Sequence, residues 1–328
     1  MTEKGLFQLL NLNLHREKDR QKLDADAIVR AVQQDPSSAD KKYKFKISPC
    51  SDQRCFPLHQ AIALKAPAHV IHALSSPIAL KAKCAGHRAL HLALQYGAPQ
   101  DVISVMLEKQ PGAETKNNIY GNKPLHSACG HNVSLDVVML LLNRCPDVLT
   151  KKNRFGDTPL HVACRKKAPL AIVSLLLSRH PEALNGKNRY DVTPLQLACQ
   201  YETLDVVLMM LDSWLKDNMN RNSSSIESLK RYASCSESED VRKLITHLSI
   251  LYSNVRSKKN VSLVGVLSFF VRIQWWNGVD LAIDQHPVLV LLKLWIFTST
   301  SWKIFSTWLS VVSNERGLII DAKIHILK

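Results

Sequence analysis

The chain has none of the short motifs that supply most enzyme chemistry. It contains no G-x-G-x-x-G or G-x-x-x-x-G-K phosphate loop, no H-E-x-x-H metal motif and no G-x-S-x-G nucleophile elbow. Acidic residues are also scarce, with nine across 51–200 and none clustered, so paired carboxylates for acid–base catalysis are not expected. The sequence therefore predicts no catalytic residues, no cofactor and no enzyme activity.

Metal-binding residues are equally sparse. Cys50, Cys55 and His59 have the chemistry of zinc ligands, but a structural zinc site needs four ligands and no fourth is near. His59 also belongs to a motif that recurs along the chain, described below. We therefore predict ordinary loop cysteines and no metal site.

The start of the chain has no uninterrupted apolar region and no small-residue cleavage site, so no signal peptide is expected. Of the eight cysteines, Cys129, Cys164 and Cys199 recur at an interval of 35 residues, which is typical of small buried side chains. Unpaired internal cysteines indicate a reducing, intracellular compartment, either cytoplasmic or nuclear.

What the chain does contain is a repeated motif. The segment 157-DTPLHVAC-164 has counterparts at 56-FPLHQAIA-63, 87-HRALHLAL-94, 122-NKPLHSAC-129 and 192-VTPLQLAC-199. Their anchor residues His59, His91, His126, His161 and Gln196 are 32, 35, 35 and 35 residues apart. A fixed period between 20 and 50 residues indicates one supersecondary unit, copied and stacked. We expect the four motif histidines to form hydrogen bonds between adjacent hairpins and not to act in catalysis.

One unit can be followed through its local signals. Thr158 is a good helix N-cap, and Pro159 stands at the first helical position, where its missing N–H is not needed. A second helix is expected at about 170–180, apolar around most of its circumference and ended by Pro181. The polar stretch 185–191 then forms a turn or hairpin that leads to the next cap.

The run from Asp157 to Ala163 resembles the T-P-L-H-x-A signature of the ankyrin repeat, and the order of elements fits the same family. The resemblance implies an all-α repeat solenoid, an ankyrin-like stack of helix-turn-helix units with short hairpin loops, with about five repeats of ~35 residues over 55–215. The period exceeds the usual ~33 residues, and Cys145-Pro146 and His180-Pro181 replace an expected glycine. We expect the extra residues to lie between the second helix and the hairpin.

Outside the array the sequence changes character. We predict an N-terminal helical cap and basic insertion at 1–54, a polar linker at 216–240 and an apolar, Trp-rich helical segment at 241–328. Within these segments, helices are expected over 24–39, 239–252 and 280–287. The stretch 288–312 is long enough to span a membrane but contains Lys293 and Lys303. Packed cap helices, an amphipathic surface helix and a membrane span all remain open for it.

The formal net charge is +15, and residues 151–200 contain nine Lys and Arg against three Asp and Glu. Together with the ankyrin resemblance, this basic charge predicts a non-catalytic scaffold or adaptor that binds an acidic protein on the concave face of the array. Arginine and aromatic residues anchor many interfaces. The expected partner-binding residues are Arg154, Phe155, Arg165, Lys166, Lys167, Arg189, Tyr190 and Tyr201.

Three alternatives stay open beside a monomeric protein-binding array. A membrane-associated adaptor would use 288–312, and an enzyme would need a further domain within 240–328. Weak nucleic-acid binding through the basic surface is less favoured, because the basic residues are not interleaved with stacking aromatics beyond Phe155 and Tyr190.

Overall fold

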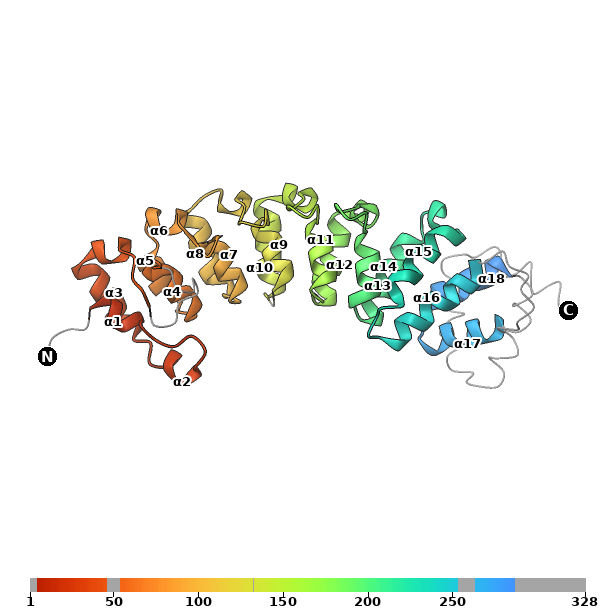
Figure 1. The fold of residues 1–328 in the computed structure, drawn as a ribbon, viewed down its shortest axis with the longest axis horizontal. Helices are drawn as coiled ribbons and strands as arrows, with labels where there is room; N and C mark the ends of the chain where they lie inside the picture. The colour runs from red at the N-terminus through yellow and green to blue at the C-terminus, as the bar shows by residue number, and fades with distance from the viewer. Residues whose placement is uncertain (1–4, 46–53, 132, 253–262, 287–328) are drawn as a thin grey trace. The chain divides into compact units, whose positions relative to one another are not determined.

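The computed structural model describes residues 5–45, 54–131, 133–252 and 263–286 (Figure 1). Within these ranges the fold is an all-α repeat solenoid, as the sequence predicts, and its one sheet is the antiparallel pair β1 (Lys83–Cys84) and β2 (His87–Arg88). The described residues divide into two compact units, one within Met1–Lys216 and Arg231–Val241 and the other within Asp217–Lys230 and Arg242–Lys328.

The first unit contains one helix pair for each copy of the motif. The pairs are α4 (Pro57–Ala63) with α5 (Ala68–Leu74), α7 (Ala89–Gln95) with α8 (Gln100–Lys109), α9 (Pro124–Gly130) with α10 (Leu135–Arg144), α11 (Pro159–Arg165) with α12 (Leu170–Arg179), and α13 (Pro194–Tyr201) with α14 (Leu204–Trp214). First helices pack on first helices, and second helices pack on second helices. The stack of helix-turn-helix units is therefore present.

Local signals set where each helix begins. A proline stands at the first helical position of α4, α9, α11 and α13. Before α13, Thr193 Oγ1 accepts from the Gln196 N–H at 3.3 Å, and Gln196 Oε1 accepts from the Thr193 N–H at 2.8 Å. This reciprocal capping box satisfies two amides that would otherwise lack partners.

The prolines after the second helices do more than end them. Pro146 and Pro181 begin the short 3-10 helices η3 (Pro146–Thr150) and η4 (Pro181–Asn185). These turns lie between the second helix and the hairpin, where the sequence places the extra residues of the long period. Similar turns are η1 (Pro36–Asp40) and η2 (Ala113–Thr115), and α6 (Pro77–Lys81) occupies the same place in the first repeat.

The motif leucines form the centre of the stack. Leu58, Leu90, Leu125, Leu160 and Leu195 are each at most 3% exposed. The cysteines at the equivalent position of three repeats are also buried, and burial raises the pKa of the Cys129 and Cys199 thiols to about 12. They are therefore neutral core side chains. Cys84 is disulfide-bonded, so the expectation of unpaired cysteines is wrong for this residue.

The N-terminal residues continue both rows of helices. Helix α3 (Ala25–Gln34) packs on α5, and α1 (Leu6–Leu10) packs on α4, while α2 (Glu17–Arg20) lies in the connection between α1 and α3. The helix expected within 24–39 is therefore present. Beyond η1, Tyr43 and Cys55 exchange two backbone hydrogen bonds of 2.9 Å.

Residues 216–240 are not a loop throughout, in contrast to the predicted polar linker. They contain η5 (Asn218–Asn220) and α15 (Ser223–Ala233). Ile226, Leu229 and Ala233 are at most 2% exposed and have the spacing of one helix face. This short stripe is hidden among serines, which is why composition alone indicates a loop.

The C-terminal helices follow the predicted pattern. Helix α16 (Glu239–Tyr252) buries its apolar stripe, including Leu244 and Leu248 at 0% exposure. Helix α17 (Leu263–Arg272) packs on α18 (Trp276–Gln285), which ends before the His-Pro pair at 286–287. The segment 288–312 lies outside the described residues. Among the residues that are described, no helix combines the length and the apolar content needed to cross a membrane.

We expect Leu160→Ala to lower the free energy of unfolding by about 2–5 kcal/mol, because truncation of a buried leucine leaves a cavity. Leu170→Ala is the control in the same repeat: Leu170 is 44% exposed, and its truncation should cost about 0.5 kcal/mol or less. Urea unfolding followed by circular dichroism measures both. Equal losses for the two variants would contradict the packing described here.

Candidate partner-binding surface

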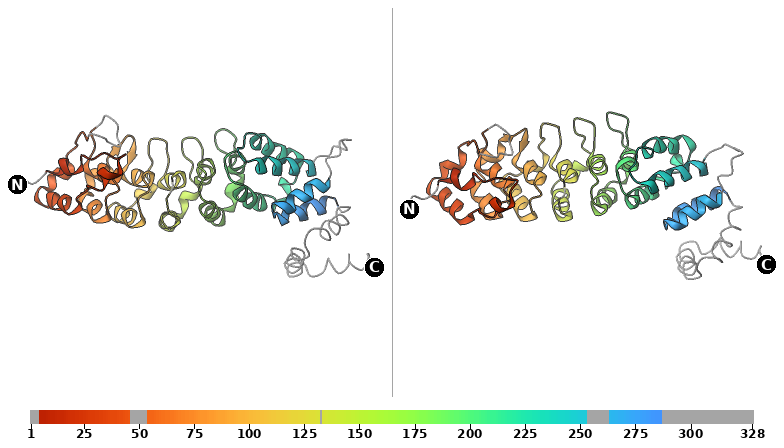
Figure 2. Two further views of the ribbon diagram at one scale, coloured as in Figure 1. Left: turned by 90° about the horizontal axis from the view of Figure 1, so that it is seen from below. Right: turned by 60° about the horizontal axis from the view of Figure 1, so that its bottom comes forward.

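Three successive hairpins project on the same side of the stack (Figure 2), formed by residues 116–123, 151–158 and 186–193. Each is shaped by an asparagine at the same position. In the middle hairpin, Asn153 Oδ1 accepts from the N–H groups of Phe155 at 2.8 Å and Asp157 at 3.0 Å. Asn118 and Asn188 make the same pair of bonds in their own hairpins.

Neighbouring hairpin tips are joined through the backbone. The Arg154 N–H donates to the Tyr120 carbonyl at 3.1 Å, and the Arg189 N–H donates to the Phe155 carbonyl at 3.0 Å. Gly156, with φ of +78°, makes the second contact feasible, because a Cβ there would lie 2.6 Å from the Arg189 nitrogen. The side chains at the tips are therefore presented in a fixed register.

The motif histidines connect each helix to the next hairpin. His91, His126 and His161 direct Nε2 at the carbonyls of Asn122 (2.9 Å), Asp157 (3.0 Å) and Val192 (3.1 Å), each 31 residues ahead. A carbonyl only accepts, so Nε2 carries the proton. Burial lowers the pKa of His91 and His126 to about 4, which keeps both rings neutral at pH 7. The predicted hydrogen-bonding role between hairpins is confirmed for these three residues.

A buried ion pair stabilises the base of the middle hairpin. Asp157 is fully buried, and both of its oxygens accept from the Arg165 guanidinium, with Nη2 to Oδ1 at 3.0 Å. Asn188 Nδ2 donates to the same Oδ1 at 2.8 Å. Hydrogen bonding to Asp157 raises the pKa of Arg165. Arg165 is thus engaged within the array, although it was predicted as a partner-binding residue.

The other predicted residues fall into two groups. Arg154, Phe155, Arg189 and Tyr190 lie at hairpin tips, and Lys166, Lys167 and Tyr201 lie at the C-terminal ends of α11 and α13. All seven are exposed, with Tyr190 at 67%. Lys167 forms an exposed ion pair with Glu237 at 2.9 Å.

Sequence reasoning missed Tyr120. It is 46% exposed and lies 35 residues before Phe155, at the same position of the preceding hairpin. Tyr120, Phe155 and Tyr190 therefore form one aromatic row, here called the tip row. The repeat register carries the signal, although Tyr120 belongs to a repeat, counted from one motif to the next, that is less basic than the two that contain Phe155 and Tyr190.

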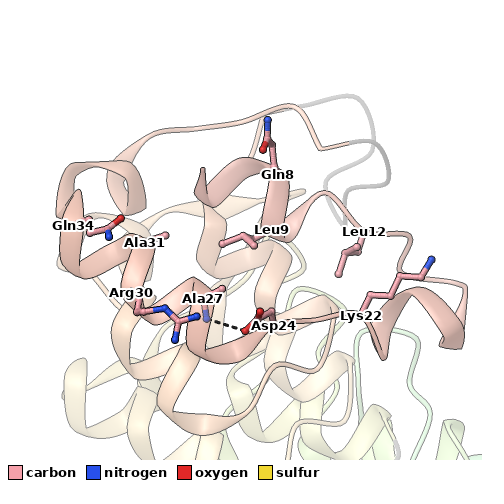
Figure 3. A pocket seen from close by; sticks show the side chains of 9 residues that line it. All are labelled: Gln8, Leu9, Leu12, Lys22, Asp24, Ala27, Arg30, Ala31 and Gln34. Carbon is pink, nitrogen blue, oxygen red and sulfur yellow. Dashed lines mark hydrogen bonds between the residues drawn. The ribbon is translucent and has the colours of Figure 1, made fainter. Parts of the chain in front are cut away.

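A separate hollow of about 450 Å³ lies between α1 and α3 (Figure 3). Its lining comes from these helices and from the loops on either side of α2: Gln8, Leu9, Leu12, Lys22, Asp24, Ala27, Arg30, Ala31 and Gln34. None of the predicted partner-binding residues belongs to it. Over the described ranges, no group of three or more His, Cys, Asp or Glu side chains is arranged to hold a metal ion. Cys50, one of the zinc candidates, lies outside those ranges.

The neutral histidines make stability depend on pH. Between pH 6.5 and about 4 the unfolded chain binds a proton at His126 that the folded chain does not, so stability is lost as pH falls, by about 1.4 kcal/mol per pH unit. Burial raises the pKa of Glu202 to about 7, which has the opposite effect but comes from one residue. The histidines should therefore dominate.

His126→Gln isolates one of them, since Gln196 already occupies the same position in the last repeat. Between pH 7 and pH 5 the unmodified chain should lose about 2 kcal/mol more stability than this variant. Urea unfolding at both values measures the difference. Parallel pH profiles would show that His126 is not held neutral.

We expect Arg165→Ala to cost about 3 kcal/mol of folding free energy, because it leaves a buried carboxylate without its cation. Asp157→Asn combined with Arg165→Gln should cost less, since Asn122 occupies the equivalent position one hairpin earlier and accepts from Asn153 at 2.8 Å. Denaturant unfolding compares them. A double variant no more stable than Arg165→Ala would refute the ion-pair argument.

Comparison with known families agrees with this geometry. Residues 125–225 match the family model of ankyrin repeats, in three copies. No curated protein matches the chain. Ankyrin repeats are generally protein–protein interaction modules, and proteins built from them are typically non-catalytic. Residues 125–225 are therefore ankyrin repeats, and the helix pairs α4–α5 and α7–α8 repeat the same arrangement before them, which supports an ankyrin-repeat protein.

Proposed function

We propose that this protein is a non-catalytic scaffold or adaptor that binds an acidic protein partner through its hairpin tips and the adjoining ends of its first helices. Within this proposal the surface belongs to the concave face of the stack. The observation that supports the proposal best is the tip row, in which Tyr120, Phe155 and Tyr190 are 46%, 41% and 67% exposed.

Large aromatic side chains that are exposed at equal intervals along a surface favour a binding role over simple exposure to solvent. They supply contact area at a low entropic cost, and arginine beside them adds planar donors for carboxylates. Arg154 and Arg189 precede Phe155 and Tyr190 directly. A partner with acidic residues next to apolar side chains complements this arrangement.

The scaffold also favours binding, because the tips are ordered before any partner arrives. Their asparagine turns, cross-tip backbone bonds and histidine bonds hold the row in place. Little conformational entropy is then lost when a partner binds. Within the proposal, Lys166, Lys167 and Tyr201 extend the contact area, and Arg165 orders the surface from below.

The test is affinity capture with the full chain, followed by mass spectrometry and titration of the partner it retains. Replacement of Tyr120, Phe155 and Tyr190 together by serine should weaken partner binding by about tenfold or more, because interface aromatics are frequent hot spots. The matched control replaces Leu135, Met139 and Leu170, which are 37–44% exposed on the second helices, by serine.

The control variant should bind as the unmodified chain does. If the tip variant retained full affinity, or if the control lost affinity equally, the proposed surface would be wrong. Circular dichroism of both variants checks that the fold is retained.

A further inference from the structure

A shallow hollow of about 220 Å³ lies across the tips of the three hairpins 116–123, 151–158 and 186–193. The first hairpin lines it with Asn117, Asn118 and Gly121, the second with Lys152, Asn153 and Arg154, and the third with Arg189. Three cationic side chains line it, Lys152, Arg154 and Arg189, and no acidic side chain does. The remaining lining is polar and comes from asparagines and Gly121. This volume is several times the ~30 Å³ share of one water molecule, so a tetrahedral oxyanion fits.

The two arginines are held in place by contacts between neighbouring tips. A Cβ at Gly121 would lie 2.9 Å from Arg154 Cγ, and a Cβ at Gly156 would lie 3.0 Å from Arg189 Cγ. Each arginine stem therefore lies against the backbone of the preceding hairpin. This packing fixes the base of each side chain, so less freedom is lost when a guanidinium binds an anion.

The acids of the same hairpins are engaged elsewhere. Asp157 is buried and accepts from Arg165 and Asn188. Asp191 pairs with Lys187 at 2.9 Å. In the described part of the chain, no ion pair involves Arg154 or Arg189. Lys152 donates to the Lys187 carbonyl at 2.7 Å, an uncharged acceptor that leaves its positive charge uncompensated.

From this arrangement we propose that the hollow is a binding site for the phosphoryl group of a phosphorylated protein segment. A phosphomonoester carries about two negative charges at pH 7 and three acceptor oxygens, and arginine binds it through paired N–H groups. A carboxylate carries only one negative charge, so it would neutralise less of the positive charge of these three side chains than a phosphoryl group would. The proposal rests on the proposed function, since it specifies the chemistry of the partner.

A nucleic acid is the competing source of phosphate. Its phosphodiesters carry one charge each, and single strands bind along extended basic tracks. One hollow lined by three cationic side chains matches a monoester better. The favoured ligand is therefore a singly phosphorylated peptide. The tip-row residues, which are next in sequence to Gly121, Arg154 and Arg189 of the lining, would contact the residues that flank its phosphate.

The first experiment is calorimetric titration of the full chain with inorganic phosphate in a chloride buffer. Arg154→Gln with Arg189→Gln should weaken phosphate binding by about tenfold or more, because both planar donors are removed. The matched control is Arg144→Gln with Arg179→Gln, which removes the same charge from equivalent positions at the ends of α10 and α12. It should change the affinity by less than about twofold.

The second experiment compares a phosphoserine peptide of acidic sequence, its unphosphorylated form and a short single-stranded RNA. The phosphopeptide should bind more tightly than the other two, and only its binding should depend on Arg154 and Arg189. Equal losses in the test and control pairs, or RNA that displaces the phosphopeptide at equal charge, would overturn the proposal.

Dephosphorylation of the captured partner separates the two ideas. If the dephosphorylated partner still binds and its binding still requires the tip row, the proposed function is supported and the phosphoryl-binding site is refuted. If phosphate binds in the hollow but replacement of the tip row leaves partner binding unchanged, the phosphoryl-binding site is supported and the proposed partner-binding surface is refuted.

Discussion

The structure depends most on one hydrogen bond, made by a histidine at the third position of a first helix to a carbonyl of the following hairpin. It occurs three times, from His91, His126 and His161, and each bond joins groups 31 residues apart. Because the accepting carbonyl belongs to the next repeat, the bond couples neighbouring units directly. A repeat array has no long-range core, so such nearest-neighbour terms decide its cooperativity.

The same bond fixes the hairpins from which the candidate surface is built. Each hairpin is held at its base by a histidine, in its turn by an asparagine, and at its tip by a backbone bond to its neighbour. The arginines and aromatics at the tips are thereby presented at regular intervals without a sheet or a closed cleft. In the proposed function, this regular spacing is what a partner protein would recognise.

Much of this was predictable because the information is local and repeated. The T-P-L-H segment contains its own cap, its first-turn proline and its core leucine, so helix starts and core positions follow from the period. The apolar stripe of α16 was clear because its apolar residues keep helical spacing along the segment. Helix α15 was missed because its stripe of three apolar residues is short and its other positions are polar. Burial of that stripe depends on neighbours that the sequence does not identify.

The sequence by itself therefore determined the fold class, the register of the repeats, the buried leucines and cysteines, and the basic character of the 151–200 region. Tertiary structure alone decided which charges are available. Arg165 and Arg154 have the same chemistry and stand within one repeat, yet one is bound to a buried carboxylate and the other lines an acid-free hollow. The reason is geometric: contacts between repeats set the paths of the turns, and these paths decide whether a charged side chain meets a group of opposite charge. Spacing along the chain does not show those paths.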